Sequence, residues 1–431
     1  MAVHKMWSKS SLIGRLRDFS KSTFAVLGIS TFLFMGLNAG AYYLMPYIAS
    51  QPPANVFDAV LWPHSEMGKR VLPEIFGVKE WEEAIKYNDV SPSFAMHPSL
   101  SFITEPVRNE HFSMSVEGVR LEPSWSGDSI RRQLGNHPHL IFALGGSTML
   151  GHGVGGNHTI PFYMNEALQK SDNLVLNFGS QAYDQLRAIE KLVYLLRSGF
   201  QPQCVIFLDG WNDIIGMARS NQRPQDKLVY HGFVTNRGHI AFTPGDRRDD
   251  RKHVKLFLES LPVYRLFGEY QSRSFQVEDI VVERDAFVQG FDFYEAEFVH
   301  SHWFQFADQY RDLLKTQIVE SFVDNLKFLK DLSKGFNFQV YSFFQPIGLL
   351  DLTNPFVPET ARKAAGYDYI LDMEQTLSQA IDSGTLEMID LSEGLREVLG
   401  QKYVDVAHYS PLANKMLATE IIAKMGSCSH N

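Results

Sequence analysis

The chain has 431 residues, 45% of them hydrophobic and 21% charged, an ordinary composition for a globular protein with a sizeable core. Its net charge of −9 and pI near 5.9 argue against a nucleic-acid-binding protein. Its two cysteines, Cys204 and Cys428, lie far apart. We therefore expect neither a disulfide framework nor a cysteine metal cluster, with Cys204 buried and Cys428 exposed.

Residues 23–48 contain no Asp, Glu, Lys or Arg, and a run of this length can cross a bilayer as a tilted helix. The tail at residues 1–22 is basic, whereas residues 49–61 have no Lys or Arg. This asymmetry predicts a single-pass anchor in the cell membrane, with the tail in the cytoplasm and the rest exported. A cleaved signal peptide is the alternative, because Ala39-Gly40-Ala41 resembles a cleavage site. The apolar run continues beyond that point and favours the anchor.

Residues 50–137 show no long periodic segment. Residues 79–87 fit a short amphipathic helix, and several prolines indicate extended or turning chain elsewhere. The segment nevertheless contains more aromatic residues than a solvated linker would: Phe94, Phe102, Phe112 and Trp125. We expect it to be irregular and to pack on the core domain.

From residue 138 to residue 426 apolar strands alternate with amphipathic helices. Strands are predicted at residues 140–144, 174–177, 204–208, 338–344 and 386–389. Helices are predicted at residues 160–169, 184–197, 310–332, 359–383 and 412–424. This alternation predicts an α/β fold of three layers, with a doubly wound, flavodoxin-like, five-stranded parallel sheet between helices.

The alternation breaks at residues 214–308, which show no clear strand–helix repeat. The charged run at residues 246–252 is typical of a solvated surface. Because this insertion follows the carboxyl end of a predicted strand, we expect it to lie near the edge of the sheet where such folds build their sites.

Polar and glycine residues follow the predicted strands at that edge. Gly145-Gly146-Ser147-Thr148 follows the first strand, and in isolation it reads only as a turn. Asp405 and His408 stand just before the last helix. A serine hydroxyl needs a base, the base needs an orienting acid, and the oxyanion needs donors. Ser147, His408 and Asp405 can supply the first two requirements.

Two further residues can serve as oxyanion donors. Gly179 follows the second strand and can present an unshielded backbone N–H group. Asn212 follows the third strand and can present a side-chain amide. The sequence thus predicts a site with catalytic residues Ser147, Asp405 and His408 and an oxyanion hole formed by Ser147, Gly179 and Asn212.

These blocks together resemble the SGNH hydrolases, also called the GDSL esterase and lipase family. The blocks occur in the family's order between residues 140 and 422: Gly145-Gly146-Ser147-Thr148, Asn177-Phe178-Gly179, Gly210-Trp211-Asn212-Asp213, and Asp405 with His408. The first block has glycine where the family name has aspartate. The resemblance implies that Ser147 is the nucleophile, His408 the base and Asp405 its partner, with the Ser147 N–H, Gly179 and Asn212 as oxyanion donors.

The expected function is ester hydrolysis outside the cytoplasmic membrane, with an acylated carbohydrate, such as an O-acetyl ester, as a candidate substrate. An O-acyltransferase acting on an exported polysaccharide is one alternative. A non-catalytic carbohydrate-binding or assembly protein that retains the fold is another. We expect no cofactor and no metal, because the histidines lack ligand partners at useful spacing in the sequence: His4, His152, His158, His300 and His302. The oligomeric state is left open.

Overall fold

The computed structural model describes residues 56–219 and 310–429, apart from short gaps that lie mostly between residues 77 and 138. The described residues fall in one unit, Pro53–Pro244 with Val281–Asn431. The predicted anchor at residues 23–48, nearly all of the helix expected at residues 79–87 and most of the insertion at residues 214–308 lie outside the described residues. Within the described ranges, no helix combines the length and the apolar character needed to cross a membrane.

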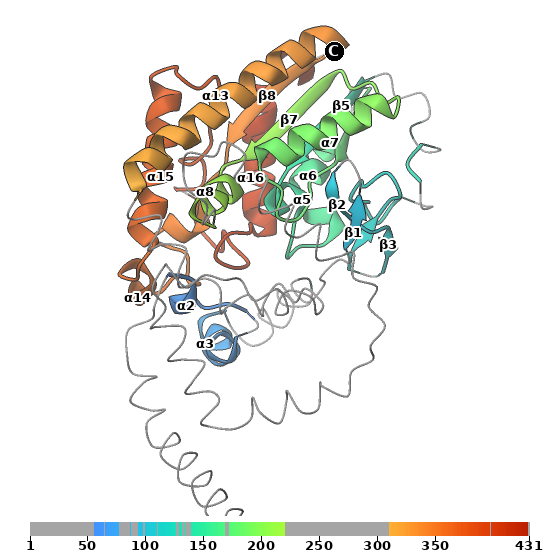
Figure 1. Cartoon of the computed structure of the whole chain (residues 1–431). Helices are drawn as coiled ribbons and strands as arrows, with labels where there is room; N and C mark the ends of the chain where they lie inside the picture. Colours follow the sequence, from blue (N-terminus) through green and yellow to red (C-terminus); the bar gives the residue numbers. More distant parts are fainter. Residues whose placement is uncertain are drawn as a thin grey trace, which may run out of the picture. The chain divides into compact units, whose positions relative to one another are not determined.

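The centre of the unit is a parallel sheet of five strands in the order β6-β5-β7-β8-β9 (Figure 1). This is the order 2-1-3-4-5 of flavodoxin-like sheets, so the prediction of a five-stranded parallel sheet is confirmed. The strands are β5 (His139–Gly145), β6 (Asn173–Asn177), β7 (Cys204–Asp209), β8 (Gln339–Phe344) and β9 (Ile389–Asp390).

The last strand is shorter than predicted and begins later. Only Ile389 and Asp390 pair with β8. Leu386, predicted to start the strand, instead donates its N–H to Ala380 O in the turn that closes the preceding helix. Its apolar side chain is still buried, which explains why hydrophobicity alone suggested a longer strand.

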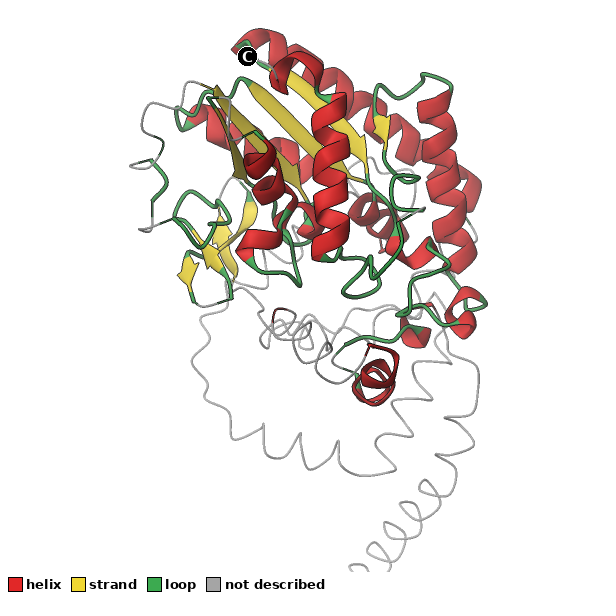
Figure 2. Cartoon of the chain, turned by 180° about the vertical axis from the view of Figure 1, so that it is seen from behind, coloured by secondary structure: helices red, strands yellow, loops and turns green. Residues whose placement is uncertain are grey.

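Helices cover both faces of the sheet, as the opposite views in Figures 1 and 2 show. The protein has a hydrophobic core on each face of the sheet. β5 contributes side chains to both cores, because successive residues of a strand point to opposite faces. Phe142 and Leu144 pack with α7 (Gln185–Arg197). Ile141 and Ala143 pack in the larger core. That core includes residues of the neighbouring helices α6 (Ile160–Ala167) and α16 (Pro411–Lys424).

One predicted helix is divided. Residues 359–383 form α14 (Glu359–Arg362) and α15 (Tyr367–Asp382), separated at Gly366. Gly366 has a φ of 91°, a left-handed conformation that ends regular helix and suits glycine. The long helix α13 (Arg311–Phe336) extends a few residues beyond its predicted end, to Asn337 in the same left-handed region.

The segment before the sheet contains short elements that periodicity did not reveal. They are α2 (Val56–Ala59), α3 (Glu66–Phe76), an antiparallel pair of β1 (Phe94–His97) and β2 (Ser101–Thr104), and a second pair of β3 (Val107–Arg108) and β4 (Ser113–Met114). Val56 N–H donates to Ala365 O, and Leu61 N–H donates to Phe356 O, both at 2.8 Å. Apolar residues of α2 and α3 are buried in the larger core.

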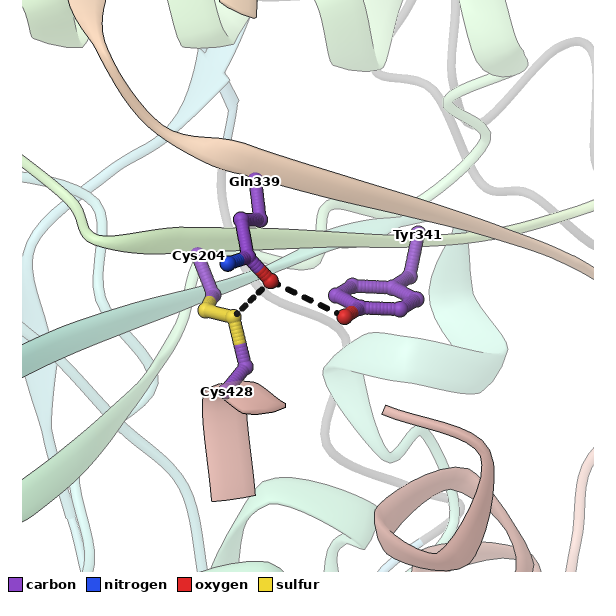
Figure 3. Close-up of a disulfide and its surroundings, with 4 residues drawn as sticks. All are labelled: Cys204, Gln339, Tyr341 and Cys428. Carbon is purple, nitrogen blue, oxygen red and sulfur yellow. Dashed lines mark hydrogen bonds between the residues drawn. A yellow bond between two sulfur atoms is a disulfide. The ribbon is translucent and has the colours of Figure 1, made fainter. Parts of the chain in front are cut away.

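A disulfide joins Cys204 to Cys428, which corrects the expectation of two unpaired cysteines (Figure 3). Cys204 begins β7, and Cys428 lies in the short helix η5 (Gly426–Ser429). Cys428 is buried, not exposed. Gln339 Oε1 of β8 lies 3.2 Å from its sulfur. The 224 residues that separate the pair hide their proximity in the sequence. It arises because η5 packs against the start of β7.

Candidate active site

Ser147 is the first residue of α5 (Ser147–Leu150), immediately after β5 and two glycines. Gly145 has a φ of 146°, which residues with a side chain rarely adopt. A Cβ atom on Gly146 would collide with Asn212 Nδ2 and would lie 2.9 Å from Tyr183 O. Both glycines are therefore needed to turn the chain and to bring the neighbouring loops close to Ser147.

Ser147, His408 and Asp405 form a continuous hydrogen-bonded relay. His408 Nε2 lies 2.7 Å from Ser147 Oγ, and His408 Nδ1 lies 2.6 Å from Asp405 Oδ2. The Asp405 Oδ1 atom accepts hydrogen bonds from the N–H groups of Ala407 and His408 at 2.8 and 2.7 Å. This places the three residues in the geometry of a nucleophile, a base and an orienting acid.

The relay favours an ionised Asp405. Burial of its carboxyl by itself raises the pKa, since a charge is costly away from water. The charge and hydrogen bond of His408 oppose this effect, together with His152 and the Ala407 amide, and the net result is a pKa below the usual range. The carboxylate can therefore orient the imidazole and stabilise a positive charge on it.

The loop after β8 supports the strand-to-helix loop that carries Asp405 and His408. Asn354 Nδ2 donates to Asp405 O at 3.3 Å and to Gly348 O at 2.8 Å. Tyr409 Oη donates to Pro346 O at 2.6 Å. A Cβ on Gly348 would lie 2.7 Å from Val406 O, so this glycine permits the close approach of the two loops.

Asn212 lies at the predicted edge, in the first turn of α8 (Trp211–Arg219) after β7. Its Nδ2 donates to Tyr183 O at 2.7 Å, and the second hydrogen on that nitrogen remains available. Asp213 secures the turn by accepting from Gly210 N–H at 3.0 Å and from Gln185 N–H at 3.1 Å. Asn212 is thus held with its amide beside the Gly146–Ser147 turn.

Gly179 has a packing role that its motif did not indicate. Its N–H donates to Asn177 Oδ1 at 3.0 Å, and a Cβ there would collide with the backbone of Leu150. Gly179 therefore permits close packing against α5 and has no unused donor. In the same loop, Ala182 adopts a left-handed φ of 59°, and no hydrogen bond within the described chain uses its N–H.

Lys191 of α7 holds the loop between β6 and α7 in place through hydrogen bonds. Its Nζ donates to Phe178 O and Ser180 Oγ at 2.8 Å and to Gly118 O at 3.2 Å. The side chain is fully buried, and burial lowers its pKa to about 7. This role could not be predicted from the sequence, because Lys191 occupies an ordinary position in an amphipathic helix.

His152 lies next to the relay, which the sequence analysis did not foresee. It is buried on the loop after α5, and its ring centroid is 4.5 Å from that of His408. Arg120 holds this loop: its Nη2 donates to Val154 O at 2.8 Å and its Nη1 to Gly151 O at 3.4 Å. Burial lowers the pKa of the Arg120 guanidinium to about 9.

The expectation that these histidines lack ligand partners is wrong for His152. Potential ligand atoms of His152, Asp405 and His408 all lie within 4.8 Å of one another. His158 differs, because its Nδ1 pairs with Tyr163 Oη at 2.8 Å. His4, His300 and His302 lie outside the described residues.

Of the known proteins compared with this chain, only solved structures are similar to it. No protein-family profile and no curated protein matches the chain. A member of the lipolytic protein G-D-S-L family from Veillonella parvula is 9% identical, with a TM-score of 0.32, and the match covers 66% of this chain and 97% of the other. An acetyl xylan esterase is 12% identical, with a TM-score of 0.31 and coverage of 66% and 98%. A carbohydrate esterase is 11% identical, with a TM-score of 0.30 and coverage of 69% and 72%. The solved structures that this chain resembles thus include a G-D-S-L lipolytic protein, an acetyl xylan esterase and a carbohydrate esterase.

Proposed function

We propose that this protein is a serine ester hydrolase in which Ser147 is the nucleophile, His408 the general base and Asp405 the orienting acid. The observation that carries the proposal is the relay from Asp405 through His408 to Ser147, with distances of 2.6 and 2.7 Å. A lone hydroxyl is a weak nucleophile, and a base at hydrogen-bond distance is what activates it.

In the proposed reaction, Ser147 Oγ attacks the ester carbonyl carbon while its proton moves to His408 Nε2. His408 then returns the proton to the departing alcohol, and water releases the acyl group from Ser147 by the same steps. Among the described residues, the N–H groups of Ser147 and Ala182 and the second hydrogen of Asn212 Nδ2 have no acceptor, and we propose them as donors to the oxyanion.

The proposed substrate is an acylated carbohydrate, with an O-acetyl group as the simplest case. Purified full-length protein should hydrolyse p-nitrophenyl acetate faster than long-chain p-nitrophenyl esters, and Ser147→Ala should be inactive. A fluorophosphonate should add its mass to the peptide that contains Ser147. An unlabelled Ser147, with no turnover of any ester, would contradict the proposal and favour a binding or assembly protein.

A second experiment distinguishes hydrolysis from acyl transfer. With an acetylated donor and a soluble sugar present together, an esterase releases acetate to water, whereas a transferase moves it to the sugar hydroxyl. Transfer that exceeds hydrolysis would identify an O-acyltransferase that uses the same three residues.

We also propose that the site works outside the cytoplasmic membrane, held there by residues 23–48. The uncharged run and the basic tail before it support this orientation. The disulfide between Cys204 and Cys428 is consistent with it, because disulfides persist mainly in oxidising compartments. Alkaline phosphatase is active only when it is exported. Fused after residue 431, it should therefore be active. Activity of a cytoplasm-specific reporter at the same position would contradict this topology.

A further inference from the structure

We infer that His152, His408 and Asp405 form a binding site for a divalent transition metal ion such as Zn²⁺, and that the bound ion switches off the catalytic base. Metal binding itself depends only on the three side chains. Its inhibitory effect rests on the proposed esterase function.

The three residues meet from two separate parts of the chain. His152 lies on the loop after α5, and Asp405 and His408 lie on the loop before α16. Their candidate ligand atoms lie within 4.8 Å of one another. A tetrahedral Zn²⁺ with bonds of about 2.0–2.2 Å holds its ligands roughly 3.5 Å apart, so small side-chain rotations would close the site.

The donor set suits zinc. Two imidazole nitrogens and one carboxylate oxygen are ligands that Zn²⁺ accepts in sites that keep an open fourth position. His152 and Asp405 are buried, and the His408 side chain is 15% exposed, so His408 is the most exposed of the three proposed ligands.

Binding at His408 Nδ1 explains how the ion would inhibit. In the metal-free relay Nδ1 faces Asp405, and Nε2 faces Ser147 Oγ. When a metal occupies Nδ1, the single ring proton of the neutral imidazole must reside on Nε2. Nε2 then donates to Ser147 Oγ and can no longer accept its proton.

The other side chains that could bind zinc allow a controlled test. Both cysteines are joined in the disulfide, so no thiolate competes for zinc in the oxidised protein. His158 provides a matched control, because its ring pairs with Tyr163 and lies outside the three-residue group. Substitution of either histidine by Gln removes one imidazole and leaves the net charge of the neutral form unchanged.

Calorimetric titration with Zn²⁺ should use full-length Ser147→Ala protein, which retains all three ligands without turnover. Adding His152→Gln should remove one bound ion per chain or weaken its binding at least tenfold, whereas adding His158→Gln should leave the titration unchanged. Co²⁺ in place of Zn²⁺ should give the visible absorption of a tetrahedral site, and this band should be lost only with His152→Gln.

Activity measurements complete the test. Zn²⁺ should inhibit ester hydrolysis by wild-type and His158→Gln protein at equal concentrations, and EDTA should reverse the inhibition. His152→Gln, compared with its own metal-free rate, should need at least tenfold more Zn²⁺. Unchanged zinc binding in the His152→Gln background would overturn the proposal even if esters are hydrolysed. Specific binding without any esterase activity would instead leave the site intact and refute only the proposed function.

Discussion

Three residues of the candidate site depend on neighbours that fix their positions. Asp405 is oriented by two backbone amides of its own loop, and Ser147 by the two glycines before it. Asn212 is oriented by Tyr183 O. Because these partners lie on different elements, single substitutions can separate positioning from chemistry.

Asn212→Ala removes a donor without disturbing the relay. If the amide stabilises the oxyanion, kcat should fall roughly a hundredfold to a thousandfold, the scale reported for loss of one such donor. KM should change little, because the charge forms only in the transition state. Steady-state kinetics on one chromogenic ester provide the measurement. A raised KM with normal kcat would assign Asn212 to substrate binding instead.

Ser147 and His408 should act as one unit. Ser147→Ala and His408→Ala should each remove nearly all turnover, and the double variant should lose little more than either. Asp405→Ala should be milder, since an imidazole without its orienting carboxylate still accepts a proton part of the time. Comparison of kcat/KM among these variants tests the assignment. Losses that multiply in the double variant would show that the two residues act independently.

Lys191 should give the protein a pH-dependent stability. Its pKa is lowered to about 7 by burial, against about 10.4 in an unfolded chain. Below pH 7 Lys191 is protonated in both the folded and the unfolded protein, and the burial of its charge lowers the free energy of unfolding by the full amount. Between pH 7 and 10 the unfolded state binds more protons, so this residue makes the free energy of unfolding rise with pH.

The measurement for Lys191 is urea unfolding at pH 7, 8 and 9. The wild type should gain stability relative to Lys191→Met by on the order of 1 kcal/mol per pH unit. The variant is the reference because all other titrating groups are shared. A difference that stays constant with pH would show that Lys191 keeps its proton throughout.

At the scale of elements, the loop between β6 and α7 and the start of α5 form one packed unit. Gly179 lies against the backbone of Leu150, and Lys191 ties the loop to α7. In this loop, Tyr183 O accepts a hydrogen bond from the side-chain amide of Asn212. A displacement of the loop should therefore move an oxyanion donor as well as reduce stability.

Gly179→Ala tests this unit. The added methyl group would meet the Leu150 backbone, which cannot rotate away, so we expect a loss of about 1–3 kcal/mol together with a lower kcat. Gly335→Ala on α13 is the control, because nothing lies within 4 Å of its Cβ position. There alanine should stabilise the helix by roughly 0.5 kcal/mol. Equal effects of the two changes in chemical denaturation would exclude the packing explanation.

The alternating strands and helices of the core could be predicted because each carries its own periodic pattern. β5, β7 and α7 lie within about one residue of their predicted bounds. Ser147, Asn212, Asp405 and His408 could be proposed as site residues because each follows a recognisable strand or precedes the last helix. His152 and Arg120 were missed because their roles depend on tertiary contacts, to His408 and to the loop after α5. The oxyanion role of Gly179 stays a prediction, and its packing against Leu150 could not be predicted, because a motif shows that a glycine is needed without showing which contact requires it.

At the scale of the whole molecule, the disulfide links the start of β7 to a helix 224 residues later. Such a link restricts the unfolded chain, and loss of a native disulfide typically costs about 2–5 kcal/mol. Reductant should therefore lower the melting temperature of the wild type. A Cys204→Ala/Cys428→Ala variant should melt at a lower temperature and be insensitive to reductant. Identical melting of the oxidised and reduced wild type would argue against a stabilising bond.

The hydrogen bond between His408 and Ser147 joins residues 261 positions apart, and contacts of such long range form late in folding because a large loop must first be closed. Activity is therefore a reporter of completed folding. After dilution from denaturant, helical circular dichroism should return first and ester hydrolysis last. A chain trapped with only β5, β6 and β7 assembled would hold Ser147 without His408, so we expect such a chain to show no ester hydrolysis.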